Sequence, residues 1–479
     1  MNHSDLLRAA DLIRAQAAAR VGDTFRLHYH FMPPAHWMND PNGLVYYQGY
    51  YHVFYQHNPF GPRWGSMHWG HARTKDFITW EHLPLALAPS EPYDAGGCFS
   101  GSAVAADGLL HLFYTGVRME GDKLVQVQCR AISQDGVHFT KDPRNPLISS
   151  YPREGSADFR DPRVWRHGGA WYMAVGSGKN GRGKVLLYRS DNLSRWDYVG
   201  VAAESHGTQG AIWECPDLFP LGGKHVLLVS PVEREPRRVL CFVGEMDYAA
   251  GQFRKEAEGE LDKGPDFYAA QTFFGSDRRI LLAWMQSWEG EIPTQEQNWA
   301  GAFTLPRELS LDAAGRLRVA PVPELKQLRT GVVFSSEVDL EGWSGGLAIC
   351  DLQSSGLEAI LRVDMHQTTA DEFGLLWRTS TGGEGLAAVS VSRAQGELYL
   401  DTTKARRGHR GRYVCKVDPR RGELEVRAFL DRSSIEVFGD GEAGSITARI
   451  YPDDPQLVLD MFARGGVLKA SLELWELAP

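Results

Sequence analysis

The stretch Gly49-Tyr50-Tyr51-His52-Val53-Phe54-Tyr55 sets the pattern of this chain: a glycine turn leads into a short strand rich in aromatic residues. Units of the same kind, a turn and then an apolar strand, recur at 108–114, 169–174, 223–229 and 279–284. Their starts fall roughly 55 to 60 residues apart, a spacing typical of propellers and repeat arrays. Five such units predict five four-stranded blades around a central channel.

A second recurrence favours this interpretation. Segment 74–81, Thr-Lys-Asp-Phe-Ile-Thr-Trp-Glu, resembles segment 189–197, and segment 132–139 is a looser copy. The alternative is an irregular β-sandwich in which the strand spacing is coincidental. Two overlapping recurrences are more typical of a propeller, so we expect an all-β chain built on five blades.

The repeat ends near Pro321, and the strands beyond it differ. Segments 373–378, 424–430 and 434–438 alternate apolar and polar residues between polar turns, which predicts an appended β-sandwich. Before the propeller, apolar residues spaced among charges predict a short amphipathic helix. We therefore predict three parts: an N-terminal helical extension (1–24), a five-bladed β-propeller catalytic domain (25–325) and a β-sandwich (326–479).

Composition limits the partners and the location that we expect. The net charge is −9 with both signs interspersed, so neither a nucleic acid nor an anionic membrane is expected as a partner. The N-terminus lacks the unbroken apolar run of a signal peptide, and no stretch reaches transmembrane length. Six cysteines are scattered without a CxxC pair, which is typical of a reducing compartment. We therefore expect a cytoplasmic protein.

The run Trp37-Met38-Asn39-Asp40-Pro41-Asn42-Gly43 carries the first chemical signal. Asn, Asp, Pro and Gly together predict a tight turn, with the carboxylate of Asp40 at its corner. A carboxylate beside Trp37 and amide donors suits sugar recognition and attack on a sugar carbon. For this run alone, a surface turn without chemistry is the alternative.

Two further carboxylates stand in short motifs, Arg160-Asp161-Pro162 and Trp213-Glu214-Cys215-Pro216-Asp217. Each motif alone also fits a structural turn. Glu214 is expected to be partly desolvated, which suits a general acid near neutral pH. All three carboxylates precede a repeat unit, so a propeller would bring them together at its axis. Glycoside hydrolysis needs such a pair, about 5–5.5 Å apart where configuration is retained.

With these motifs the chain resembles glycoside hydrolase family 32, the invertase and fructanase family, and most of all its bacterial sucrose-6-phosphate hydrolases. The resemblance covers nearly everything after about residue 25, in order along the chain. The segments that carry it are 37–43, 54–59, 69–72, 98–103, 160–162, 213–217, 266–269, 305–309 and 431–438.

The resemblance implies an enzyme, a β-fructofuranosidase that hydrolyses terminal β-D-fructofuranosides such as sucrose 6-phosphate or sucrose with retention of configuration. Asp40 would be the nucleophile, and Glu214 the acid and then the base. Asp161 would hold fructose hydroxyls and stabilise the oxocarbenium-like transition state. The substrate-binding residues would be Asn39, Gln56, Trp64, Phe99, Ser100, Arg160, Tyr268 and Trp299.

Three tryptophans leave an alternative open. Trp64, Trp288 and Trp299 each fit either a sugar contact or core packing, and Trp288 is the weaker sugar candidate. Cys215 is expected to be a small packed residue beside Glu214, since no histidine motif pairs with it to make a nucleophile.

No metal or other cofactor is expected. Nine of the sixteen histidines lie before residue 83, and the pairs His28/His30 and His68/His71 have ligand-like spacing. No carboxylate or thiolate completes a recognisable ligand set, so we attribute these histidines to strand packing and sugar hydrogen bonds. The resemblance implies a small sugar as the partner. We expect the sandwich to have a stabilising, dimer-forming or lectin-like role, in a monomer or in a homodimer formed through it.

The sequence determines neither the identity of the leaving group nor the choice between hydrolysis and fructosyl transfer. Short fructo-oligosaccharides, transfer to an acceptor sugar and sugar binding without turnover are the alternatives. A sugar phosphate would require basic residues near the glucosyl site. Candidates on predicted loops are Arg118, Lys179, Arg182, Arg234, Arg237 and Arg238, each of which also fits a solvated surface charge.

Overall fold

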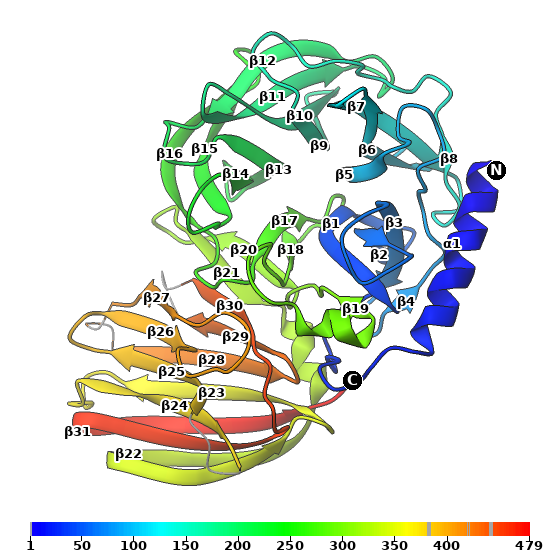
Figure 1. Cartoon of the computed structure of the whole chain (residues 1–479). Helices are drawn as coiled ribbons and strands as arrows, with labels where there is room; N and C mark the ends of the chain where they lie inside the picture. Colours follow the sequence, from blue (N-terminus) through cyan, green and yellow to red (C-terminus); the bar gives the residue numbers. More distant parts are fainter. Residues whose placement is uncertain (1, 381–384, 419, 421, 440–443) are drawn as a thin grey trace.

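In the described residues, five small sheets form a ring and one larger sheet forms the C-terminal part (Figure 1). The predicted all-β architecture is therefore confirmed: a five-bladed propeller, then a β-sandwich, with one short N-terminal helix. The computed structural model describes residues 2–380, 385–418, 420, 422–439 and 444–479.

Each blade is a four-stranded antiparallel meander in chain order, and its first strand lies next to the propeller axis (Figure 1). The predicted repeat units are the second strands of the blades. The strands are β1 His36–Tyr47, β2 Tyr50–Asn58, β3 His68–Thr74 and β4 Glu81–His82; β5 Gly97–Ala106, β6 Leu109–Glu120, β7 Lys123–Ser133 and β8 Thr140–Lys141; β9 Phe159–His167, β10 Ala170–Lys179, β11 Arg182–Ser190 and β12 Asp197–Glu204; β13 Ile212–Leu221, β14 Lys224–Val232, β15 Leu240–Asp247 and β16 Gln252–Glu260; β17 Tyr268–Thr272, β18 Ile280–Trp284, β20 Arg307–Leu311 and β21 Leu317–Pro321.

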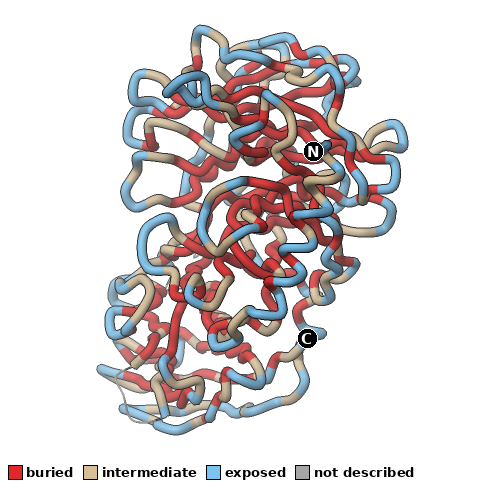
Figure 2. The backbone as a smooth tube through the Cα atoms, turned by 45° about the vertical axis from the view of Figure 1, so that its right-hand side comes forward, coloured by how far each residue is buried: buried red, intermediate tan, exposed pale blue. Residues whose placement is uncertain are grey.

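A short strand from the last part of the propeller closes the ring. After the 3-10 helix η1 (Pro293–Gln297), strand β19 (Trp299–Ala300) runs parallel to β1 and pairs Trp299 with His36. Joining the last blade to the first in this way removes an open edge. The strands around the axis are mostly buried, whereas the connecting loops are exposed (Figure 2).

Every innermost strand breaks its ladder, β1 at two points and each of the other four at one. A β-bulge of this kind twists the strand locally and turns a side chain to a new direction. Five bulges at comparable positions therefore direct side chains of five blades towards the axis. They fall at Met38/Pro41 on β1, Phe99/Gly101 on β5, residues 160–163 on β9, Glu214/Asp217 on β13 and Tyr268/Gln271 on β17.

The sandwich is organised by two long strands that pair along their length, β22 and β31. The first half of β31 also pairs with β24 and its second half with β23, so one strand connects the two faces. An aliphatic core that includes Trp377 and Leu472 lies between these faces. The elements are η2 Pro323–Leu328, β22 Arg329–Asp351, β23 Gly356–Asp364, β24 Glu372–Thr379, β25 Gly385–Ser392, β26 Glu397–Asp401, β27 Arg412–Lys416, β28 Glu423–Asp431, β29 Ser434–Gly439, β30 Ser445–Arg449 and β31 Gln456–Leu477.

A buried ionic network joins the propeller to the sandwich. The His30 ring contacts Asp431 Oδ2 at 2.8 Å and Glu436 Oε1 at 2.9 Å, and Arg307 pairs with both Glu436 and Asp262. Burial alone would lower the pKa of His30, but its hydrogen bonds to the two carboxylates outweigh burial and raise the pKa to about 8. The two parts are thus held by groups that are costly to separate.

The N-terminal helix α1 (His3–Ala18) begins at Asn2, whose side chain accepts a hydrogen bond from the Asp5 amide. It packs against the first blade, where Arg14 donates to the carbonyl of Leu83 (Figure 1). In the described part of the chain, no helix combines the length and apolar character needed to cross a membrane. The domain boundaries after residues 24 and 325 stay predictions.

Candidate active site

Three carboxylates reach the propeller axis from three blades. Asp40 lies on β1, Asp161 on β9 and Glu214 on β13, each at the bulge of its strand. Asp161 has φ +66° and Cys215, which follows Glu214, has φ +48°, a backbone region that is uncommon for non-glycine residues. The predicted turn at Asp40 is wrong: pairing with β2 keeps the run in a strand, and its Asn, Pro and Gly residues produce a bulge instead.

Asp40 is held by hydrogen bonds from its own strand, β1, and from the neighbouring strand β5. Ser100 Oγ donates to Oδ2 at 2.6 Å, and Asn39 Nδ2 donates to Oδ1 at 3.1 Å. The Trp37 indole N–H donates to Asn39 Oδ1 at 2.7 Å and so orients that amide. Burial raises the pKa of Asp40 to about 6; the Ser100 hydrogen bond opposes this rise and the charge of Glu214 adds to it. Above this pH the carboxylate is ionised and positioned.

Asp161 lies beside Asp40, with Cys215 between them. The backbone N–H of Cys215 donates to Asp161 Oδ2 at 2.8 Å, and its Sγ lies 3.5 Å from that oxygen and 3.6 Å from Asp40 Oδ2. Burial and the charge of Glu214 raise the pKa of Asp161 to about 7, although Arg160 opposes them. Cys215 is thus the small packed residue that was predicted, but it contacts the two aspartates.

Glu214 is more open, with a side chain that is 21% exposed. Arg160 Nε donates to Oε1 at 2.9 Å, and the Tyr268 hydroxyl donates to Oε2 at 2.7 Å. These two contacts fix the position of both carboxylate oxygens. The charge of Glu214 in turn adds to the rise in the pKa of Asp40 and of Asp161.

A cavity of about 330 Å³ opens above these carboxylates. Its base is polar and buried, whereas Trp64 and Leu124 at its mouth are 51% and 42% exposed. The combination of polar groups at depth and aromatic groups at the rim is typical of a small-ligand site. The cavity brings together ten of the eleven predicted residues: Asn39, Asp40, Gln56, Trp64, Phe99, Ser100, Arg160, Asp161, Glu214 and Tyr268.

Trp299 is the exception, and its predicted sugar contact is wrong. Its side chain is fully buried in a separate cluster with Phe25 and Leu27, between the guanidinium groups of Arg26 and Arg449. Pairing of β19 with β1 fixes this tryptophan inside the closure of the ring. The weaker candidate, Trp288, lines the cavity instead, 39% exposed and packed against Trp37 and Trp284.

The two tryptophans should therefore respond differently to truncation. We expect Trp288→Ala to raise KM about five- to tenfold, since an aromatic contact is worth about 1 kcal/mol. Trp299→Ala should instead cost about 3–5 kcal/mol of unfolding free energy, as loss of a buried aromatic side chain does. Steady-state kinetics and thermal unfolding of both variants check this. A higher KM with unchanged stability in Trp299→Ala would contradict the assignment.

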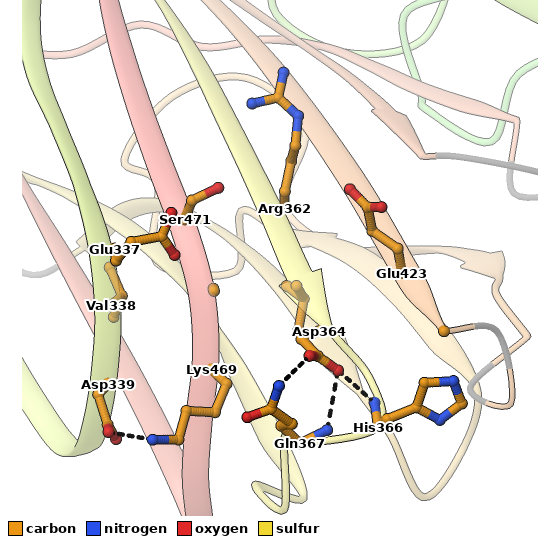
Figure 3. A pocket seen from close by; sticks show the side chains of 13 residues that line it. Glu337, Val338, Asp339, Arg362, Asp364, His366, Gln367, Glu423, Lys469 and Ser471 are labelled. Carbon is orange, nitrogen blue, oxygen red and sulfur yellow. Dashed lines mark hydrogen bonds and ion pairs between the residues drawn. The ribbon is translucent and has the colours of Figure 1, made fainter.

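Cavity size alone does not identify the site. A hollow of about 750 Å³ lies on the sandwich, lined by β22, β23, β28 and β31 (Figure 3). Several of its polar groups are already paired: Lys469 contacts Asp339, and Asp364 accepts hydrogen bonds from Gln367 and from the His366 amide. It therefore lacks the converging, electrostatically strained groups of the propeller cavity.

The histidines with ligand-like spacing make other contacts. His71 stacks on Phe54 with ring centroids 4.1 Å apart and contacts His52 Nδ1 at 3.0 Å, as expected for strand packing. His30 belongs to the network between propeller and sandwich. Among the described residues, no group of three or more His, Cys, Asp or Glu side chains is arranged to hold a metal ion.

Comparison with known families identifies the chain. It matches the model of the glycosyl hydrolases family 32 N-terminal domain over residues 30–321, and that of the family 32 C-terminal region over residues 324–476. The chain belongs to glycosyl hydrolases family 32. It is a glycosidase, and its propeller and sandwich correspond to the two conserved regions of that family.

Relatives within family 32 cover nearly the whole chain. The sucrose-6-phosphate hydrolase of Zymomonas mobilis is 37% identical over 99% of this chain and 97% of its own length. The raffinose invertase of Escherichia coli is 40% identical over 96% and 97%. A family 32 β-fructofuranosidase structure from Bombyx mori superimposes with a TM-score of 0.87 at 35% identity, covering 99% of this chain and 98% of that one.

Six cavity residues of this family 32 chain were not among the predicted binding residues. Asp158, three positions before Asp161, accepts a hydrogen bond from Arg160 at 2.8 Å, and its nearness to that motif was the one available signal. The six are Leu124, Gln126, Asp158, Val232, Arg237 and Trp288. Trp288 was the weaker tryptophan candidate and Arg237 one of the basic candidates for a phosphate, whereas Leu124, Gln126 and Val232 belong to no motif.

Ionisation of Asp40 should cost this family 32 fold stability. Its pKa rises from 3.8 to about 6 on folding, so its stabilising contribution is complete below pH 3.8 and is lost as the pH rises through about 6. We expect Asp40→Asn to gain stability between pH 4 and pH 6 and keep the gain above, up to about 3 kcal/mol for a shift of about two pH units. Thermal unfolding from pH 4 to 8 checks this.

The exposed Asp122 provides the control, since Asp122→Asn removes the same charge outside the cavity. Its unfolding temperature should differ from that of the native protein by the same small amount across this range. Lower stability of Asp40→Asn than of the native protein at pH 8 would contradict the burial argument.

Proposed function

We propose that this chain is a retaining β-fructofuranosidase that cleaves sucrose-type substrates and releases fructose. The observation that carries the proposal is the convergence of Asp40, Asp161 and Glu214 at the base of one small cavity. The names of its family 32 relatives, sucrose-6-phosphate hydrolase, raffinose invertase and β-fructofuranosidase, support the same class of substrate. A Bombyx mori variant solved in complex with sucrose adds to this support.

In the first step, the ionised carboxylate of Asp40 attacks the anomeric carbon of the fructosyl unit. Ser100 and Asn39 hold its two oxygens and leave one rotamer for attack. Glu214 gives a proton to the glycosidic oxygen, so that the leaving sugar departs as a neutral alcohol. A covalent fructosyl-enzyme and the free leaving sugar result.

In the second step, the Glu214 carboxylate takes a proton from water, and the resulting hydroxide attacks the fructosyl carbon and releases Asp40. Arg160 and Tyr268 stabilise this carboxylate through their contacts with its two oxygens. Asp161, fixed by the Cys215 amide, accepts hydrogen bonds from fructose hydroxyls and faces the positive charge of the transition state. Two inversions at one carbon give net retention.

The experiment that tests this function is fructose release from sucrose and from short inulin-type oligosaccharides. We expect turnover, with the β-anomer of fructose as the first product observed by NMR. Sucrose at high concentration would reveal transfer products if fructosyl transfer competes with hydrolysis. Binding of sucrose without turnover, or turnover of p-nitrophenyl arabinofuranoside alone, would overturn the proposal.

We also propose a cytoplasmic enzyme. All six cysteines are free and buried, which fits a reducing compartment. Association through the sandwich stays a prediction, and light scattering of the purified protein tests it.

A further inference from the structure

The mouth of the cavity is where the leaving sugar must lie. The fructosyl unit has to reach Asp40 at the base, so the group that it leaves behind extends outward past Glu214. On that side the lining comes from the loop after β14, which contributes Arg237, and from the loop after β18, which contributes Trp288. These two loops therefore select the leaving group.

Basic residues near this mouth determine whether a phosphorylated sugar can bind, because positively charged side chains must balance the two negative charges of the phosphate. Of the six basic residues suggested by the sequence, Arg237 is the one that lines the cavity. The other two arginines of its loop are engaged elsewhere. Arg234 pairs with Glu260 at 2.6 Å, and Arg238 lies under the Tyr413 ring of the sandwich.

Arg237 already has a counter-ion. Its Nε lies 3.1 Å from Glu289 Oε1, so this ion pair joins the two loops. The Glu289 amide donates to Ser287 Oγ at 3.0 Å, which fixes the start of that loop. Among the described residues, no hydrogen bond engages the two Nη groups of Arg237. Arg237 therefore keeps its Nη donors available at the cavity while its Nε is paired with Glu289.

The net charge of the cavity also disfavours a phosphorylated leaving group. Four carboxylates line it, those of Asp40, Asp158, Asp161 and Glu214, against the guanidinium groups of Arg160 and Arg237. Negative charge therefore predominates, and Glu289 adds to it through its ion pair with Arg237. A phosphate at the mouth would meet this field and would have to displace Glu289 from Arg237, whereas sugar hydroxyls can use the pair as it stands.

We propose that the Arg237–Glu289 pair selects an unphosphorylated leaving group, so that the chain hydrolyses sucrose and short fructo-oligosaccharides in preference to sucrose 6-phosphate. This inference rests on the proposed β-fructofuranosidase function. It separates the chain from what the name of the Zymomonas mobilis relative states and brings it nearer to that of the raffinose invertase.

The test is the ratio of kcat/KM for sucrose to kcat/KM for sucrose 6-phosphate. We expect the native ratio to be about ten or more, the scale on which one mismatched polar contact discriminates. Glu289→Gln frees the Arg237 charge, so the ratio should fall about tenfold. Arg237→Gln leaves Glu289 unpaired, so the ratio should rise about tenfold. A merely structural role would not move the ratio in opposite directions.

Two variants serve as matched controls. Glu291→Gln removes a carboxylate from the same loop, and Arg234→Gln removes a guanidinium from the other loop; neither residue lines the cavity. Both should keep the native ratio within about twofold, since neither charge lines the cavity. A native preference for sucrose 6-phosphate, or a ratio unchanged by Glu289→Gln, overturns the inference. Failure to hydrolyse any fructoside overturns the proposed function instead.

Discussion

Replacing Asp40 by alanine is expected to lower kcat on sucrose by about 10⁴-fold or more, because the proposed covalent route would lose its nucleophile. A water molecule held by Ser100 and Asn39 would be a much weaker nucleophile than this carboxylate. The fold should persist: Asp40 is a buried charge, and its removal relieves a desolvation cost. Initial rates and circular dichroism check the two halves of the expectation.

Ser100→Ala tests how much the hydrogen bond to Asp40 contributes, separately from the carboxylate itself. It removes one hydrogen bond from Asp40 and leaves the carboxylate present, so we expect a loss of about 10- to 100-fold. Asp122→Ala, outside the cavity, should keep native activity. Activity of Asp40→Ala close to that of the native enzyme would exclude Asp40 as the nucleophile.

Replacing Glu214 by glutamine is expected to affect substrates according to their leaving groups. For sucrose, departure of the sugar needs a proton, so kcat/KM should fall about 10²- to 10⁴-fold. For β-fructofuranosyl fluoride no proton is needed, and kcat/KM should fall less than about tenfold. Because the base for the second step is also lost, the fluoride should show a burst and then slow turnover.

Azide provides the discriminating control for this variant. It attacks the fructosyl-enzyme without a base, so it should restore steady-state turnover of the fluoride and give β-fructofuranosyl azide. Tyr268→Phe, which removes one hydrogen bond from Glu214, should show a smaller loss with the same ordering of substrates. Equal losses on sucrose and on the fluoride would rule out the acid role.

The propeller could be predicted because each blade repeats a turn and an apolar strand, and that pattern is local in the chain. The three carboxylates could be predicted for the same reason, since each stands shortly before a repeat unit. The local structure at Asp40 could not. Residues with turn preferences occupy a strand there, because pairing with β2 provides hydrogen bonds that a turn would forgo.

Contacts between different blades could not be predicted from the sequence. Trp288 and Trp299 are eleven residues apart, and their different surroundings follow from the pairing of β19 with β1, which connects residues far apart in the chain. Likewise, Arg237 and Glu289 belong to loops of different blades, and nothing local links them. Spacing and propensity describe neighbours along the chain, whereas these contacts depend on how the ring closes.

The buried ionic network between propeller and sandwich restricts how this protein can be recombined. Glu436 of the sandwich serves His30 and Arg307 of the propeller at once. A hybrid that takes its sandwich from a relative without an acid at that place would leave two buried cations with too little negative charge. We therefore expect a hybrid of propeller and sandwich from different homologues to fold only if both parents have residues equivalent to His30, Arg307 and Glu436.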